Sequence, residues 1–175
     1  MRTCKEECLY YLKYSRTEKE VRSHLYNKDY KTNEIEEAIA YAKELNYIDD
    51  YDYAYSYIND HILINKWGPL KIKINLRDKG ISDETIENGL LDCEELIYRN
   101  LEDQANKKIN VNRELDYNEK NKIIRHLLNK GYEYQMIKEV LDKYEWLFCI
   151  YSRMFWQKFL LWNHNWYWPT SENAQ

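Results

Sequence analysis

Two adjacent carboxylates, Asp49 and Asp50, are the side chains of this sequence whose type and spacing best suit acid–base catalysis. A carboxylate pair can divide the roles of general acid and general base, but no histidine, metal-ligand set or glycine-rich loop accompanies this pair. An enzyme is therefore not expected. The two residues stand just before a predicted helix, where carboxylates accept hydrogen bonds from free backbone N–H groups and contribute about 0.5–2 kcal/mol. The interpretation that stays open beside this one is a contact with a basic partner surface.

The thiols could bind a metal or form disulfides, but their spacing argues against both. The cysteines are Cys4, Cys8, Cys93 and Cys149, which match neither a disulfide framework nor a zinc signature. Cys4 and Cys8 share one helical face and His24 could join them, but the sequence offers no fourth ligand for zinc. We expect reduced thiols in a cytoplasmic protein, with no metal and no cofactor.

Lysines and arginines form two groups that could contact a polyanion. In the first group, Lys66, Lys73 and Arg77 follow helical spacing and are expected on one outward face, because Ile72 and Leu76 turn inward. The second group consists of Lys107, Lys108, Arg113, Lys122 and Arg125. A solvated face is one interpretation of such rows. The other is contact with DNA phosphates or with an acidic partner groove, where Lys and Arg give charge-assisted hydrogen bonds.

The charge of the whole chain excludes a uniformly basic nucleic-acid binder, because the formal net charge is −4. The charges are arranged in blocks. Residues 66–79 carry 5 basic and 1 acidic group, residues 80–106 carry 1 basic and 8 acidic, and residues 107–130 carry 7 basic and 3 acidic. Alternating patches of this kind suit a partner whose own surface has mixed charge.

A repeat with a period of 51 residues indicates the elements that position these side chains. One pattern occurs three times: an aliphatic residue, a leucine, a lysine, a Gly or Asp, a large apolar residue and two further aliphatic residues. The copies are Val21, Leu25, Lys28, Asp29, Tyr30, Ile35, Ile39; Ile72, Leu76, Lys79, Gly80, Ile81, Ile86, Leu90; and Ile123, Leu127, Lys130, Gly131, Tyr132, Ile137, Leu141. A fixed period predicts stacked supersecondary units, each too small to bury its apolar face alone.

Each copy carries a helix stop signal at a tight turn. Gly80 and Gly131 follow a predicted helix C-terminus, where the left-handed backbone conformation favours glycine. Asp29 takes the same place in the first copy, and aspartate tolerates that conformation better than most residues. Gly68 and Pro69 are expected to shape the turn before the second copy, with Pro69 as the first helical residue. We assign these residues a structural role.

The sequence predicts an all-α fold, an elongated curved array of three tandem three-helix repeats. Gly and Pro number only 4 and 2, which suits helices joined by short loops. We place the units at residues 1–46, 47–93 and 94–144. The longer helices that open the second and third units are expected over residues 51–66 and 93–112.

Residues 145–175 depart from the repeat. The last 30 residues hold five of the six Trp and all three Phe, but only three charged side chains. A terminal helix docked on the third unit, an interfacial membrane or oligomer contact, and a tail of altered reading frame are all open interpretations, and disorder is expected after Pro169. No uncharged run reaches the roughly 18–20 residues that span a membrane. Residues 1–16 have no apolar stretch, so a signal peptide is not expected.

Three motifs of this chain together resemble the RecX family, bacterial regulators of the RecA recombinase. The first motif covers residues 15–28. It consists of a basic residue, then Ser or Thr and Glu, and then a predicted helix that contains a leucine and ends in lysine. The second is Tyr47-Ile48-Asp49-Asp50, and the third is Lys66-Trp67-Gly68-Pro69 with the turn at residues 79–81. The resemblance covers about residues 5–143. Asp29 replaces the usual glycine, and Lys66-Trp67 stands where an arginine often precedes Gly-Pro.

The resemblance implies a function that composition cannot. It implies binding inside the groove of the RecA filament on single-stranded DNA, with inhibition of ATP hydrolysis, filament growth and strand exchange. It also implies weak DNA contact, no catalytic residues, and a role in DNA repair and the SOS response. A cytoplasmic monomer is expected. The alternative function is direct DNA binding, because three-helix units with a tight turn are similar to tandem helix-turn-helix modules.

Overall fold

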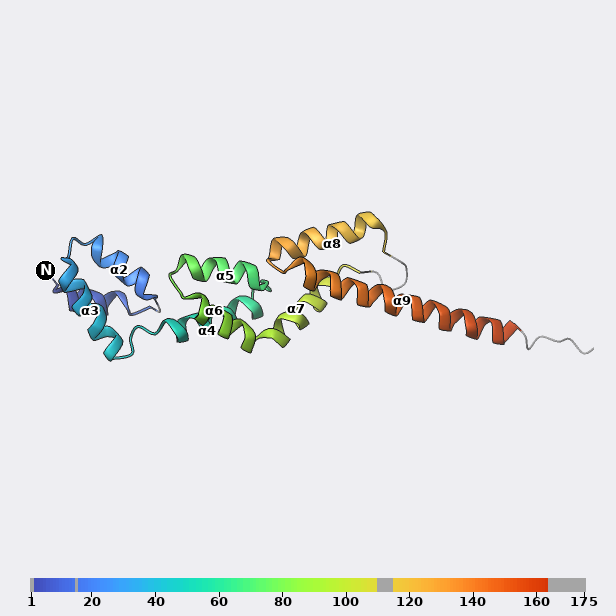
Figure 1. Ribbon diagram of the computed structural model, residues 1–175, viewed down its shortest axis with the longest axis horizontal. Helices are drawn as coiled ribbons and strands as arrows, with labels where there is room; N and C mark the ends of the chain where they lie inside the picture. Colours follow the sequence, from blue (N-terminus) through green and yellow to red (C-terminus); the bar gives the residue numbers. More distant parts are fainter. Residues whose placement is uncertain (1, 15, 110–114, 164–175) are drawn as a thin grey trace, which may run out of the picture.

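The computed structural model describes residues 2–14, 16–109 and 115–163. This part of the chain is entirely helical, as predicted, and its helices follow one another in three trios along one axis (Figure 1). The bounds of the helices are α1 Cys4–Tyr11, α2 Glu18–Tyr26, α3 Thr32–Glu44, α4 Asp50–Leu63, α5 Pro69–Asp78, α6 Asp83–Asp92, α7 Glu94–Asn106, α8 Tyr117–Lys130 and α9 Tyr134–Asn163. The elongated array of three-helix repeats is therefore confirmed.

The helices begin where the sequence carries capping residues. Thr17 accepts a hydrogen bond from the N–H of Glu20, whose side chain accepts one in return, so the expected capping box opens α2. Asp116 forms the same arrangement at α8, and Ser82 caps α6. Pro69 is the first residue of α5. Local chemistry thus fixes the start of the second helix in every trio.

The repeated turn has the predicted left-handed backbone in all three copies. The φ angles are 62° at Asp29, 88° at Gly80 and 90° at Gly131. Glycine reaches this conformation without a Cβ clash, whereas aspartate adopts it at some cost. The turn reverses the chain and sends the third helix of each trio back along the second.

Three predicted helix ends differ from the structure. α4 ends at Leu63, not at residue 66, because Lys66 itself has a left-handed φ of 53°. α7 ends at Asn106, before the expected residue 112. α9 runs from Tyr134 to Asn163 without an end at residue 144, where we placed the boundary of the third unit. Its sequence contains no Gly or Pro that would interrupt it.

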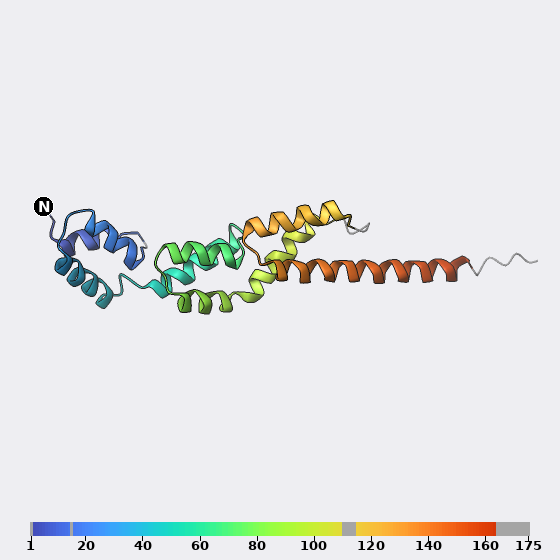
Figure 2. The same ribbon diagram turned by 45° about the horizontal axis from the view of Figure 1, so that its top comes forward.

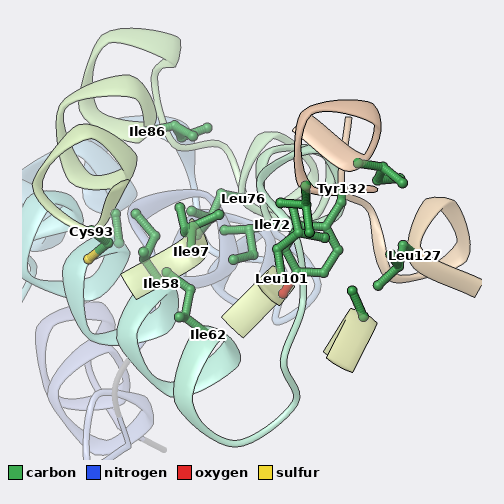
Figure 3. Packing of buried hydrophobic residues seen from close by; sticks show 14 of the residues in the cluster. Ile58, Ile62, Ile72, Leu76, Ile86, Cys93, Ile97, Leu101, Leu127 and Tyr132 are labelled. Atoms are coloured by element: carbon green, nitrogen blue, oxygen red, sulfur yellow. The ribbon is translucent and has the colours of Figure 1, made fainter. Parts of the chain in front are cut away.

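Two separate apolar cores hold the trios together. One core joins α1, α2 and α3 through buried residues that include Val21, Leu25 and Ile35. The other is shared by the second and third trios, and Figure 3 shows Tyr132 beside Ile72 and Leu101 within it. The first trio therefore has a core of its own, whereas the second and third form one packed body. Figure 2 shows α9 extending from that body along the long axis.

Candidate partner-binding surface

The first trio meets the second through polar contacts around the Lys79-Gly80 turn, and we call this region the first joint. The Thr17 hydroxyl donates to the carbonyl of Lys79 over 2.8 Å, and the ammonium group of Lys19 donates to the carbonyl of Asp78 over 2.8 Å. The ammonium group of Lys79 lies 2.6 Å from a carboxylate oxygen of Glu20. The carbonyls at the end of α5 are thus bound by side chains from the start of α2.

The same contact recurs between the second and third trios, at the second joint. The N–H of Gly68 donates to the carbonyl of Lys130 over 2.8 Å, and the N–H of Leu70 donates to the carbonyl of Gly131 over 3.0 Å. Gly68 lies 51 positions after Thr17, and Lys130 lies 51 positions after Lys79. The period of the sequence is therefore the period of the docking contact: each Lys-Gly turn packs on the start of the second helix in the preceding trio.

Glycine at these joints permits close backbone approach. A Cβ added at Gly131 would lie 2.4 Å from Cβ of Lys71, and one at Gly68 would lie 2.4 Å from the backbone of Gly131. A Cβ at Gly80 would lie 2.7 Å from Cβ of Lys19. All three glycines thus lie at close contacts between trios, which fits the structural role that we assigned them.

The adjacent carboxylates Asp49 and Asp50 serve two different helices. Asp49 accepts hydrogen bonds from Tyr51 N–H at 2.9 Å and Asp52 N–H at 3.0 Å, so it caps α4. Asp50 instead accepts from the N–H of Glu18 at 3.0 Å and so connects α4 to the start of α2 across the first joint. Burial raises the pKa of the Asp50 carboxyl, and the hydrogen bond from Glu18 offsets part of that effect.

The first predicted basic group does not form one free helical face. Lys66 precedes α5 and has a left-handed backbone, so only Lys73 and Arg77 share that helix. Lys73 lies 2.7 Å from a carboxylate oxygen of Glu87, and Arg77 binds both oxygens of Asp83 at 2.5 and 3.0 Å. The Arg77 guanidinium lowers the pKa of Asp83. Carboxylates of α6 therefore neutralise this pair.

Lysines at the second joint, by contrast, have no anionic partner among the described residues. Lys66, Lys71 and Lys130 form no ion pair with any residue that the structure describes. The ammonium group of Lys130 donates to the carbonyl of Asn65 over 3.1 Å, and that of Lys71 lies 4.4 Å from the ring centre of Trp67. Sequence patterns do not single out Lys71, and they place Lys130 only at a helix end. These two lysines lie in the same region only because one trio docks on the next.

The second predicted basic group extends this region. Lys107, Lys108, Lys122 and Arg125 are exposed, and none pairs with a described carboxylate. Burial lowers the pKa of His126, and the ammonium groups of Lys108 and Lys130 lower it further, so both lie near that ring. Arg113 lies outside the described residues. The second joint, the end of α7 and α8 thus present neighbouring cations that have no ion-pair partner in the described part of the chain.

The other predicted chemistry lies in the first trio. Cys4 and Cys8 are buried in its core, where burial raises the pKa of both thiols, that of Cys8 to about 11. His24 lies 3.0 Å from a carboxylate oxygen of Glu7. Within residues 2–14, 16–109 and 115–163, no three His, Cys, Asp or Glu side chains gather as a metal site would require. In those same ranges no helix has the length and apolar character to cross a bilayer.

Comparison with known proteins identifies the units. Three family models match in order: the first three-helix domain of RecX over residues 4–41, the second over residues 49–90 and the third over residues 94–141. Together they span most of the described chain.

Relatives and a solved structure agree with these matches. A regulatory protein RecX of Clostridium botulinum (strain Alaska E43 / Type E3) is 38% identical over 132 residues, which cover 73% of this chain and 61% of that protein. The regulatory protein RecX of Clostridium beijerinckii is 37% identical, covering 80% of this chain and 67% of its own length. The crystal structure of RecX from Lactobacillus salivarius has a TM-score of 0.73 at 33% identity, covering 81% and 94% of the two chains. The matched region is thus about 61% of the length of the Clostridium botulinum relative.

Proposed function

This chain belongs to the RecX family of regulatory proteins, and on that premise we propose that it binds the RecA filament on single-stranded DNA and inhibits it. The inhibition covers ATP hydrolysis, filament growth and strand exchange. The chain acts in the cytoplasm as a monomer and performs no catalysis of its own. The observation that carries the proposal is the family match across all three trios.

The shape of the molecule supports this proposal. Three trios lie in a row, so that the array presents a long surface (Figure 1). Proteins of this architecture usually bind extended partners along their length. A filament of repeated protomers is such a partner, because one array can contact several protomers at once.

The distribution of ion pairs supports the choice of one face for this contact. Lys73 and Arg77 are already paired with carboxylates of α6, whereas Lys107, Lys108 and Arg125 form no ion pair with any residue in the described ranges. A paired cation offers a partner little net charge, since its field is largely cancelled nearby. We therefore assign the main filament contact to Lys107 and Lys108 at the end of α7, together with the cations of α8 and the second joint, and a smaller one to the face of Lys73 and Arg77.

ATP hydrolysis by RecA on single-stranded DNA tests the function. Substoichiometric protein is expected to lower the rate, and Lys107→Glu combined with Lys108→Glu is expected to weaken that inhibition several-fold. Lys73→Glu combined with Arg77→Glu is the matched control, with a smaller expected effect. Unchanged hydrolysis with the parent protein, together with no co-sedimentation with filaments, would refute the proposed function. Equal loss in both double variants would refute only the assigned face.

A further inference from the structure

A row of aromatic rings runs along α4 and ends at the second joint. Tyr53 and Tyr57 stack with ring centres 6.1 Å apart, Tyr57 and His61 meet edge to face at 4.0 Å, and His61 lies 4.3 Å from Trp67. All four side chains are half-buried, so that they cover the core and also reach the surface. We call these four residues the aromatic row.

Ammonium groups lie over both ends of the aromatic row. Lys79 lies 5.5 Å from the ring centre of Tyr53, and Lys71 lies 4.4 Å from that of Trp67. Lys79 also pairs with Glu20, so the Tyr53 end is partly neutralised. At the Trp67 end, the ammonium group of Lys130 lies at the carbonyl of Asn65, and Lys66 directly precedes Trp67 in the chain. Like Lys71, these two lysines form no ion pair with a described carboxylate.

The charged groups around His61 also include more cations than anions. Burial lowers the pKa of His61; Asp60 acts against this effect, while Lys71 and Lys79 add to it. Asp60 is therefore the one acidic group that acts on this ring among the described residues, against two ammonium groups. The row is a positively charged aromatic surface, strongest where α4, α5 and the Lys130 turn meet.

This combination fits a single strand of nucleic acid better than an acidic protein or a duplex. A single strand offers unstacked bases that stack on aromatic faces and phosphates that meet ammonium groups. A duplex keeps its base faces inside, and an acidic protein surface would bind the lysines without stacking on the aromatic rings. The N–H of Gly68 before α5 and that of Leu70 within it are already bound to the carbonyls of Lys130 and Gly131, so we expect the lysine side chains to supply the phosphate contacts.

We propose that the Trp67 end of the aromatic row binds single-stranded nucleic acid, with a base stacked on Trp67 and phosphates on Lys66, Lys71 and Lys130. Lys71 leaves the ring face and takes a phosphate when the base arrives, which its flexible side chain allows. The proposal goes beyond the proposed function by naming a surface that contacts the nucleic acid itself. It requires no recombinase, so the two can fail separately.

Fluorescence anisotropy with a labelled oligothymidine, at low salt and without recombinase, tests the proposal. Trp67→Ala is expected to raise Kd about tenfold, because one stacked base contributes about 1–3 kcal/mol. Trp67→Phe should recover most of the affinity. Lys66→Gln with Lys71→Gln should weaken binding and reduce the slope of log K against log salt by about 1.4, or about 0.7 for each phosphate that is no longer neutralised. Lys73→Gln is the matched control and should leave Kd unchanged.

The outcomes divide clearly. Binding of the single strand that depends on both Trp67 and the lysines supports the proposal, provided that circular dichroism and thermal melting show a folded variant. No binding of the parent protein, tighter binding of a duplex of equal length, or equal affinity of Trp67→Ala and the parent would each overturn it. Loss of filament inhibition in the lysine variant without any oligonucleotide binding would assign this surface to an acidic protein partner instead.

Discussion

At the scale of single residues, the close approach at the second joint depends on the missing side chain of Gly131. Gly131 has a φ of 90°, and a Cβ added there would lie 2.4 Å from Cβ of Lys71. Both features make any residue other than glycine unfavourable at this position. We expect Gly131→Ala to lower the free energy of unfolding by about 2 kcal/mol or more, measured by urea denaturation. Asp29→Gly is the opposite control, because it relieves a left-handed aspartate and should leave stability equal or higher. A Gly131→Ala variant as stable as the parent would contradict the described joint.

A second residue-scale prediction concerns Asp50, whose carboxyl has a raised pKa in the folded state. An acid with a raised folded pKa binds its proton more tightly when folded, so its ionisation costs stability as pH rises from the ordinary value of about 3.9 through the folded pKa. Asp50→Asn keeps an acceptor for the Glu18 N–H and removes this cost, so we expect equal or higher stability at pH 7. Asp50→Ala loses the acceptor and should be less stable by about 1 kcal/mol.

Denaturation of both variants from pH 3 to pH 8 measures this effect. The stability difference between Asp50→Asn and the parent should shrink as pH falls below the folded pKa, because the parent carboxyl is then neutral as well. The carboxylates with lowered pKa that do not interact with Asp50, such as Glu7 and Asp83, affect both proteins alike and cancel in the difference. A difference that grows toward low pH would show the opposite sign and reject the assigned cause.

At the scale of elements, helix starts were predictable and helix ends were less so. Thr17, Ser82 and Asp116 cap their helices through side chains within three residues, a local signal. The end of α4 depends on Lys66, whose carbonyl accepts hydrogen bonds from Gln104 and Tyr132 in the third trio. Sequence patterns over a short window do not contain such distant partners.

The same distinction applies to the candidate surface. The basic groups were visible as blocks in the sequence, but which cations are neutralised depends on the packing of α6 on α5 and on the docking of trios. Lys73 and Arg77 find carboxylates of α6, while Lys71 and Lys130 meet at the second joint from positions 59 residues apart. The repeat predicted that the trios stack but not which side chains the stacking brings together.

The separate cores predict separate cooperative units. Leu25 belongs to the core of the first trio and Leu127 to the shared core, and both are fully buried. Replacing either leucine by alanine should cost about 2–5 kcal/mol. We expect Leu25→Ala to increase amide hydrogen exchange mainly in residues 4–48, and Leu127→Ala to increase it throughout the second and third trios, measured by mass spectrometry. Uniform deprotection of the whole chain by Leu25→Ala would show one cooperative core instead.

At the scale of the whole molecule, two kinds of joint give the array two mechanical properties. The first joint is held by hydrogen bonds and by the ion pair of Lys79 with Glu20, while the second also buries Tyr132 in a shared core. Polar joints weaken with salt and yield more readily than apolar ones. We infer that the second and third trios provide a rigid contact surface and that the first trio adjusts its angle to the partner.

Electron microscopy of RecA filaments saturated with this protein can show directly whether the array lies along a filament. We expect continuous rod-shaped density that follows the filament and spans neighbouring protomers, with the second joint and α8 facing the filament. Filaments of normal appearance without added density, under conditions where they hydrolyse ATP, would contradict the proposed mode of binding.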